Sequence, residues 1–244
     1  MSVDTPTRVL IVMDRHLVAE TVAFTLNHGV YLARTVQTLP AAATLVSDWR
    51  PHLAVVDMDL DGSDFLDQIG LAGHNQRTKV PVLAMTRRGD LKTKLAAFDQ
   101  GVDDIMTVPF APEELLARAV VLTRRAYGVI PGLKPTLTVG EIEIDILTRE
   151  VRAGSSVVHL SGLEQSLLYF LVANAGRVVT RDEILDALWG EDLVAESNIV
   201  DRHVRGLRVK LQNDWRRPRF IATVPGVGYR FLPVFSTEPV EATA

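Results

Sequence analysis

The 244-residue sequence contains no cysteine, which excludes disulfide bonds and thiolate metal sites. It has no apolar run long enough to cross a bilayer, and its first residues, MSVDTPTR, lack the apolar stretch of a signal peptide. Positive charge is also scarce, because 26 lysines and arginines stand against 30 aspartates and glutamates. An acidic chain contacts nucleic acid only through a local basic patch. We therefore expect a cytoplasmic protein, with no membrane partner and with room for two ordinary domains.

The first half of the chain alternates short apolar runs with helical patterns. Residues 9–12, 53–56 and 80–85 are apolar runs of the length that a buried strand needs. Helical patterns cover residues 17–26, 41–49, 91–100 and 112–125. Strands that alternate with helices predict a parallel sheet covered on both faces, so we expect an α/β doubly wound fold here.

Polar residues follow these apolar runs directly. Asp14, Asp57 and Thr86 each lie just past the end of one run. The carboxyl ends of parallel strands meet at one edge of a sheet, and ligands bind beyond that edge. We therefore expect one shared cleft, although carboxylates at strand ends are also ordinary loop residues.

A basic helix and a hairpin pattern follow one another near the end of the chain. Val200, Val204, Leu207 and Leu211 recur at helical spacing and give the helix one apolar face. Residues 194–234 hold eight lysines and arginines against three acidic residues, a local surplus of five. Two β-rich runs then flank a Pro-Gly-Val-Gly turn. The combination suits a DNA groove and its backbone, but charge alone also allows a solvated helix beside an ordinary hairpin.

The runs SNIVDRHVRGLRVKL from Ser197 and IATVPGVGYRF from Ile221 resemble the recognition helix and wing of OmpR/PhoB-type response regulators. VVTRDEILDALWG from Val178 resembles a further segment of the same DNA-binding domain. In the first half, RVLIVMD, LAVVDMDL, VPVLAMT and GVDDIMTVPF resemble the receiver domain of this family. The resemblance implies a flavodoxin-like receiver, a linker, an α+β winged helix-turn-helix domain and a disordered tail, at residues 7–127, 128–135, 136–234 and 235–244.

In that family an aspartate accepts a phosphoryl group. An acidic pair and the aspartate hold Mg²⁺, while a hydroxyl and a lysine contact the phosphoryl oxygens. The resemblance places Asp57 at the phosphoacceptor position, Thr86 at the hydroxyl position and Asp14 at the second acid. The chemistry needs a cation and donors because the transferred phosphoryl group carries negative charge.

The sequence departs from this set at two places. Met13 stands where the first acid should be, and Val108 replaces the lysine. A weakened Mg²⁺ site would then rest on Asp14, Asp57 and a backbone carbonyl near Asp59. We expect an atypical receiver that acts independently of aspartyl phosphorylation and has no resident cofactor. Two alternatives stay open: ordinary phosphorylation of Asp57 by a histidine kinase, and a receiver that senses a small-molecule ligand.

Receivers of this branch pair through charged contacts between the fourth helix, the fifth strand and the fifth helix. The resemblance therefore implies a homodimer interface. Its matching residues are Lys94 with Glu114, Asp104 with Arg118, and Asp103 with Arg125. Exposed ion pairs contribute only about 0–1 kcal/mol each, so a plain solvated face is the alternative.

Double-stranded DNA is the expected partner of the second half, with RNA polymerase as a candidate further partner. Arginine can bridge guanine and asparagine can pair with adenine, so Asn198, Arg202 and Arg205 are the candidates for base contacts. Candidates for phosphate contacts are Arg181, His203, Arg208, Lys210, Arg219 and Arg230. No nucleophile–base pair or Gly-rich phosphate loop is apparent, so we expect no enzymatic activity.

Overall fold

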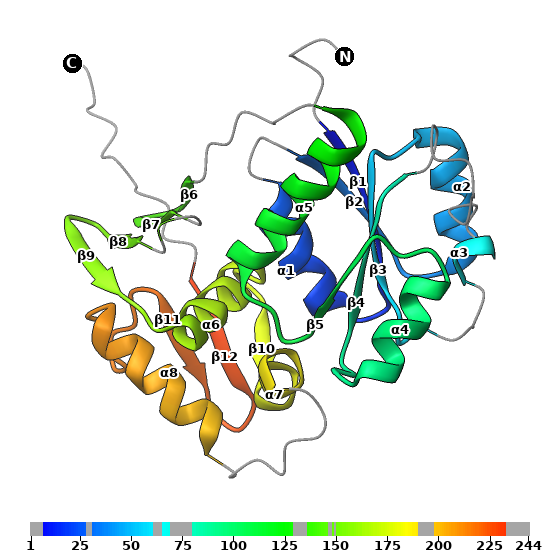
Figure 1. The fold of residues 1–244 in the computed structure, drawn as a ribbon. Coiled ribbons are helices and arrows are strands. Elements are labelled where there is room, and N and C mark those ends of the chain that lie inside the picture. Colours follow the sequence, from blue (N-terminus) through cyan, green and yellow to red (C-terminus); the bar gives the residue numbers. More distant parts are fainter. Residues whose placement is uncertain are drawn as a thin grey trace, which may run out of the picture. The chain divides into compact units, whose positions relative to one another are not determined.

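The computed structural model describes residues 7–27, 31–60, 65–68, 80–128, 136–145, 148, 150–189 and 198–232. The chain forms two compact units, shown in Figure 1. The first unit comprises Met1–Lys134 with Asp182–Val194, and the second comprises Pro135–Arg181 with Ala195–Ala244. Within the described part of the chain, no helix has both the length and the apolar character that a membrane crossing requires.

A five-stranded parallel sheet forms the centre of the first unit. Its spatial order is β2-β1-β3-β4-β5. The strands are β1 (Thr7–Val12), β2 (Tyr31–Val36), β3 (Leu53–Asp57), β4 (Val82–Thr86) and β5 (Asp104–Thr107). The register pairs Val12 with Val56 and Thr86 with Thr107, so the carboxyl ends of β1, β3, β4 and β5 meet at one edge. The expected doubly wound fold is confirmed.

Helices cover both faces of this sheet. They are α1 (His16–Leu26), α2 (Leu39–Trp49), α3 (Phe65–Gln68), α4 (Leu91–Asp99) and α5 (Pro112–Tyr127). Helix α1 packs against α5 on one face, whereas Ala42, Leu66 and Ala97 of the other three helices join a core with the opposite face (Figure 1). Every residue of β3 and β4 is buried, as their continuous apolar runs require between two helical layers.

Local sequence signals set the ends of the helices that flank β5. Helix α4 begins after Asp90, whose carboxylate accepts a hydrogen bond from the Thr93 backbone N–H at 2.9 Å. Helix α5 begins at Pro112 and ends at Gly128, which adopts a left-handed φ of 69° that glycine accommodates without strain.

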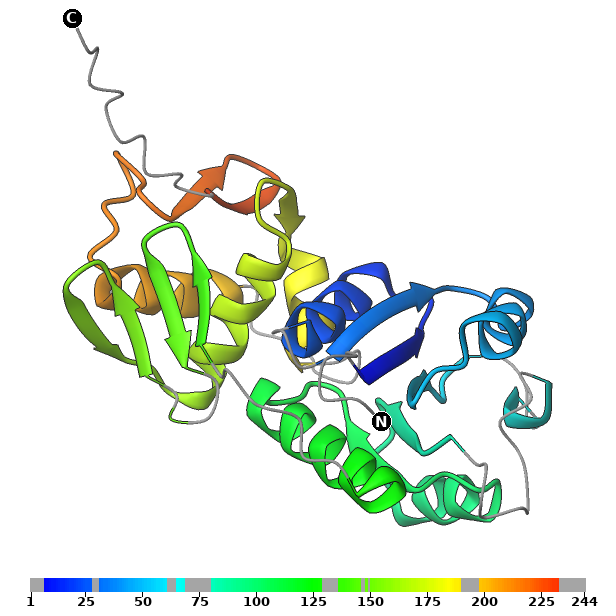
Figure 2. The same ribbon diagram turned by 90° about the horizontal axis from the view of Figure 1, so that it is seen from above.

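The second unit opens with a four-stranded antiparallel meander. The strands are β6 (Thr136–Val139), β7 (Ile142–Asp145), β8 (Glu150–Ala153) and β9 (Ser156–His159). Buried and exposed residues alternate along them, so one face packs inward and the other meets solvent. Figure 2 shows this green sheet as a layer separate from the red hairpin described next.

The rest of the second unit joins helices to a small sheet of order β10-β12-β11. Its elements are α6 (Gly162–Ala173), β10 (Val178–Thr180), α8 (Ile199–Lys210), β11 (Ile221–Val224) and β12 (Gly228–Phe231), and α7 (Arg181–Trp189) follows β10 directly. A capping box begins α6, since Ser161 and Glu164 each accept a hydrogen bond from the other's backbone N–H. The expected hairpin is the β11–β12 pair.

Candidate functional site

A cluster of charged side chains lies at the carboxyl edge of the parallel sheet. Asp57 is the last residue of β3, and its side chain is only 1% exposed. Arg15, in the loop between β1 and α1, donates from Nε and Nη2 to Oδ2 of Asp57 at 3.1 and 2.9 Å. The other carboxylate oxygen, Oδ1, accepts the Asp59 backbone N–H at 3.0 Å. Asp57 is therefore held by a cation that its own chain supplies.

Asp59 is bound by the end of the neighbouring strand. Its Oδ1 accepts the Thr86 hydroxyl at 3.0 Å, and its Oδ2 accepts the Arg87 backbone N–H at 2.8 Å. The Arg87 side chain adds an ion pair to the same oxygen at 3.4 Å. Thr86 also accepts the Arg88 backbone N–H at 3.0 Å. We call Arg15, Asp57, Asp59, Thr86 and Arg87 the strand-end cluster.

The two carboxylates of the cluster have different electrostatics. Burial raises the pKa of Asp57 above its usual value, and attraction to Arg15 opposes that rise without cancelling it. Burial also acts to raise the pKa of Asp59, but hydrogen bonds from Arg87 and Thr86 outweigh it, so the pKa of Asp59 is lowered. Ionised Asp59 is thus stabilised by donors, whereas ionised Asp57 depends on Arg15.

The residues expected around Mg²⁺ differ in exposure and in hydrogen bonding. Asp14 is exposed, while Met13 and Val108 are 0% and 3% exposed and carry no ligand atom. The carboxylate oxygens of Asp57 and Asp59 already accept hydrogen bonds from their own chain. Among the described residues, no group of three or more His, Cys, Asp or Glu side chains is arranged to hold a metal ion. Mg²⁺ needs several open oxygens, and a site on Asp14, Asp57 and a backbone carbonyl near Asp59 stays a prediction.

The expected dimer residues form contacts within one chain. Arg118 on α5 donates to Asp104 at 2.7 Å and to Glu114 at 2.7 Å, and these bonds raise the pKa of its guanidinium. Asp103 accepts the Val82 backbone N–H at 2.8 Å, while Arg125 is exposed. The half-buried Lys94 lies on α4. Exposed apolar side chains share this helix: Leu91, Leu95 and Phe98 are 71%, 54% and 46% exposed.

Helix α8 has the two faces that its sequence predicts. Val200, Val204 and Leu207 are 5%, 0% and 0% exposed, and the following residue of the set, Leu211, is also buried. The expected apolar face is confirmed. Asn198, Arg202 and Arg205 are exposed. The side chains proposed for base contacts therefore face solvent, from the N-cap of α8 to the middle of the helix.

Four side chains join α8 to the hairpin. The Asp201 carboxylate accepts from Arg181 Nε at 2.8 Å and from the Tyr229 hydroxyl at 2.7 Å. The guanidinium carbons of Arg181 and Arg208 lie 5.1 and 5.3 Å from the centroid of the Tyr229 ring. Arg208 also donates to the Ile221 carbonyl at 3.0 Å. We call Arg181, Asp201, Arg208 and Tyr229 the Tyr229 cluster.

The pKa shifts in this cluster agree with the burial and the hydrogen bonds of its side chains. Burial acts to raise the pKa of Asp201, but hydrogen bonds from Tyr229 and Arg181 outweigh it, and the pKa is lowered. Burial and the bond to Asp201 raise the pKa of Tyr229 to about 12, so the hydroxyl stays a donor near neutrality. Burial lowers the pKa of Arg208. Asp201 and Arg181 thus form an ion pair within the unit.

The remaining DNA-contact candidates have different surroundings. Lys210 Nζ pairs with Glu164 at 2.6 Å, and Arg219 pairs with Glu141 and stacks over Phe220. His203 Nδ1 lies 2.8 Å from the Ile199 carbonyl oxygen, while Arg230 is exposed on β12. Arg208, Lys210 and Arg219 therefore contribute to the packing of the unit, which the sequence pattern did not reveal.

Two functional residues were not anticipated from the sequence. Arg15 is one, and its position in the loop after β1 was the sequence feature that could have revealed it. Asn213 is the other. It is 7% exposed, and its Oδ1 accepts the backbone N–H groups of Arg219, Phe220 and Ile221 at 2.9, 2.6 and 3.2 Å. It therefore fixes the loop between α8 and β11, a role for which no periodic pattern exists.

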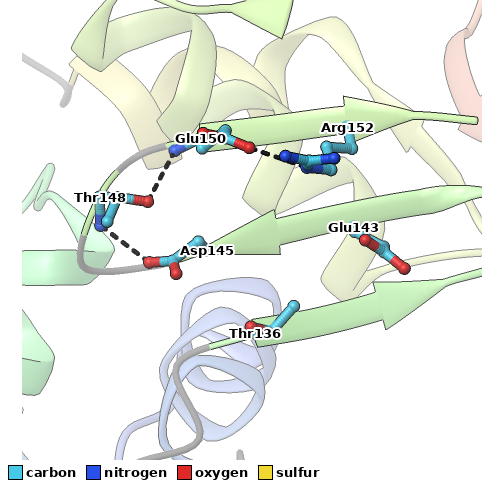
Figure 3. A pocket seen from close by; sticks show the side chains of 6 residues that line it. All are labelled: Thr136, Glu143, Asp145, Thr148, Glu150 and Arg152. Atoms are coloured by element: carbon cyan, nitrogen blue, oxygen red, sulfur yellow. Dashed lines mark hydrogen bonds and ion pairs between the residues drawn. The ribbon is translucent and has the colours of Figure 1, made fainter. Parts of the chain in front are cut away.

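A separate polar pocket lies on the solvent face of the four-stranded sheet (Figure 3). Its lining residues are Thr136, Glu143, Asp145, Thr148, Glu150 and Arg152. Asp145 accepts the Thr148 backbone N–H at 2.8 Å, and Arg152 donates to Glu150 at 2.8 Å. These bonds describe an ordinary charged sheet surface, which provides control positions for experiments on α8.

The fold and the two sites define a class: a regulator that joins a doubly wound α/β unit with a strand-end aspartate to a winged-helix unit with a basic helix. Residues 9–120 match the model of the response regulator receiver domain. Residues 154–231 match that of the transcriptional regulatory protein C-terminal domain. The chain belongs to the OmpR/PhoB-type transcriptional response regulators, a DNA-binding family of two-component systems.

Relatives match almost end to end. The chain is 36% identical over 227 residues to the response regulator MprA of Mycobacterium sp. (strain KMS), covering 92% of this chain and 96% of the relative. It is 31% identical over 229 residues to the KDP operon transcriptional regulatory protein KdpE of Escherichia coli (strain K12), covering 93% and 99%. The crystal structure of DrrB, a Thermotoga maritima OmpR/PhoB homologue, is 29% identical and covers 93% and 100%, with a TM-score of 0.42.

Proposed function

We propose that this regulator binds DNA as a homodimer and that its binding does not depend on phosphorylation of Asp57. The observation that supports the second part is the Arg15–Asp57 pair. Phosphoryl transfer to Asp57 would need a free carboxylate oxygen, a cation beside it and donors for the phosphoryl oxygens. Oδ2 of Asp57 is instead bound twice by Arg15, and Oδ1 accepts the Asp59 backbone N–H.

The residue at the lysine position supports the same proposal. A charge-assisted hydrogen bond is worth roughly 1.5–3 kcal/mol, and the buried Val108 offers none. The hydroxyl of Thr86 already donates to Asp59. A phosphoryl group on Asp57 would therefore have to displace Arg15 and attract Thr86 away from its partner. We infer that a histidine kinase is not required.

The DNA contacts proposed for α8 follow from its exposed face. We infer that the exposed Asn198, Arg202 and Arg205 read base edges in the major groove. Arg181, His203 and Arg230 suit phosphate contacts, which give affinity and salt dependence more than sequence choice. Pro225 occupies the hairpin turn where the family has an arginine, so we expect little reading of the minor groove from the wing.

Dimerisation is proposed through the face made by α4, β5 and α5. Charged residues and exposed apolar side chains lie there together: Leu91, Leu95 and Phe98 follow one another at helical spacing on α4. Two receivers paired in this way would place two winged-helix units on repeated DNA half-sites. We infer that the dimer acts on cytoplasmic DNA without catalysing a reaction, with RNA polymerase as its further partner.

The test is a selection of DNA sequences by the full chain, followed by affinity measurements with and without Mg²⁺ and acetyl phosphate. We expect repeated half-sites, and the same affinity for the wild type and Asp57→Asn under both conditions. Mass spectrometry of the treated protein reports labelling of Asp57. Labelling together with tighter binding in the wild type alone would instead support ordinary phosphorylation.

A further inference from the structure

Arg15 reaches from the loop between β1 and α1 to the carboxyl edge of the sheet. Its guanidinium lies beside the last residue of β3, and two of its nitrogens donate to the same oxygen of Asp57. The third nitrogen, Nη1, is buried and bonds to no residue in the described part of the chain. The side chain is 14% exposed. Asp57 is therefore the partner that fixes this guanidinium.

A divalent cation at this edge would meet occupied oxygens. Arg15 and the Asp59 backbone N–H take the two oxygens of Asp57, and Thr86 and Arg87 take those of Asp59. The buried Asp57 thus faces Arg15, and the partly exposed Asp59 faces Arg87. The pairs leave no net negative charge between them to attract a dication, and Mg²⁺ binds only where oxygens are open.

We propose that Arg15 is a permanent counter-ion of Asp57 that takes the place of a divalent cation in this receiver. A guanidinium keeps its proton at all physiological pH values and presents donors in a rigid plane. The loops after β1 and β3 are therefore held together with or without Mg²⁺. This inference rests on the proposed independence from phosphorylation and gives it a physical cause.

The test is thermal unfolding of the full chain with and without millimolar MgCl₂, at constant ionic strength and without any phosphodonor. Arg15→Ala removes the counter-ion. Arg88→Ala is the matched control, because its exposed side chain is a nearby positive charge that does not contact Asp57. We expect Mg²⁺ to leave the thermal midpoints of the wild type and of Arg88→Ala unchanged. Arg15→Ala should lower the midpoint of the first unit by about 5 °C or more, because a buried carboxylate loses its partner.

Mg²⁺ should recover part of that loss in Arg15→Ala, since the vacated carboxylate can then attract it. The recovery should disappear in Arg15→Ala/Asp57→Asn, whose amide carries no charge. If Arg15→Ala does not fold, Arg15→Gln keeps an N–H donor without the charge and serves the same comparison. A wild-type midpoint that Mg²⁺ raises overturns the proposal, as does an Arg15 variant that behaves like Arg88→Ala.

The two proposals fail in different ways. A wild type that is labelled at Asp57 by acetyl phosphate and then binds DNA more tightly, but whose midpoint is unchanged by Mg²⁺, would contradict the proposed function and leave the counter-ion role standing. A wild type that responds to Mg²⁺ without being labelled would remove the counter-ion role alone. Labelling and the Mg²⁺ response are therefore measured on the same preparation.

Discussion

Arginine has opposite roles in the two units of this protein. In the first unit, Arg15 and Arg87 turn toward the sheet edge, where Arg15 pairs with Asp57 and Arg87 pairs with Asp59. In the second unit, Arg202 and Arg205 stand exposed on α8. The difference follows from the partner: a buried aspartate requires a nearby cation, whereas an amphipathic helix needs only its apolar face covered.

Helix α8 also contains an arginine whose side chain binds its own unit. Arg208 lies on the same helix as Arg202, yet it donates to the Ile221 carbonyl and to the Thr223 hydroxyl. Arg181 Nε likewise donates a hydrogen bond to the Asp201 carboxylate. The local surplus of five positive charges in residues 194–234 therefore overstates the charge offered to DNA, because Arg208 belongs to it and holds the wing against the helix.

The largest expected effect comes from removing the outward arginines. Arg202→Ala/Arg205→Ala should weaken binding to the selected DNA by about 100-fold or more, since each base contact is worth roughly 1–3 kcal/mol. Fluorescence anisotropy of labelled duplexes measures the loss. Arg152→Ala is the control, because it removes an exposed arginine from the sheet surface of the same unit. Equal losses in both would show that general charge, not the α8 face, carries the affinity.

The next effect concerns the strand that holds the wing beside α8. A Cβ on Gly228 would overlap the carbonyl oxygen of Val179 on the paired strand β10. Gly228→Ala should therefore destabilise the second unit by about 2–3 kcal/mol, in the range of other overpacking substitutions. Gly162→Ala is the control, since a Cβ there meets no atom within 4 Å and alanine favours a helix. Denaturant unfolding of both variants gives the comparison, and equal stabilities would contradict the close approach of β10 and β12.

Sequence patterns predicted the elements whose burial is uniform or periodic. The runs of β3 and β4 are buried along their whole length, and the apolar stripe of α8 is buried as its spacing required. Strand β2 has no such pattern. Its residues, YLARTV, form an edge strand in which buried, half-buried and exposed side chains follow no regular order. Pairing with β1 sets its conformation. Tertiary pairing is invisible in a local window of sequence.

The candidate site was predictable only in part for the same reason. Asp57 and Thr86 were found because strand ends in a parallel sheet converge. Arg15 was not, since the direction of one loop side chain depends on a neighbouring strand far away in sequence. Arg202 and Arg208 could not be told apart either, because their different roles follow from where the hairpin packs.

A smaller effect is expected on the α4–β5–α5 face. Leu95 is 54% exposed, so Leu95→Glu should leave folding intact. If this face pairs two receivers, the variant should raise the dimer dissociation constant by about 10-fold, because a charge replaces apolar area in the interface. Sedimentation velocity over a concentration series measures it. Lys92→Glu, an exposed change on the same helix, is the control, and an unchanged constant for Leu95→Glu would place the dimer contact elsewhere.

The smallest expected effect is the loss of stability in acid that comes from Asp201 in the partly exposed Tyr229 cluster. The pKa of Asp201 is lowered in the folded protein, so its stabilising contribution is present above its ordinary pKa and is lost as pH falls through the lower, folded value. Tyr229 remains protonated over this range and does not change the sign. At 45% side-chain exposure, the contribution is screened and should stay below about 1 kcal/mol.

Asp201→Asn removes that contribution at all pH values. The thermal midpoint of the second unit should therefore be lower than that of the wild type near neutral pH, and the difference should vanish as pH falls through the lowered, folded-state pKa of Asp201. The pH-dependent contributions of the other carboxylates cancel in this comparison, because both proteins carry them. A difference that persists unchanged into acid would mean that the Asp201 charge does not stabilise the junction. The hydrogen bond geometry alone would then hold α8 to the wing.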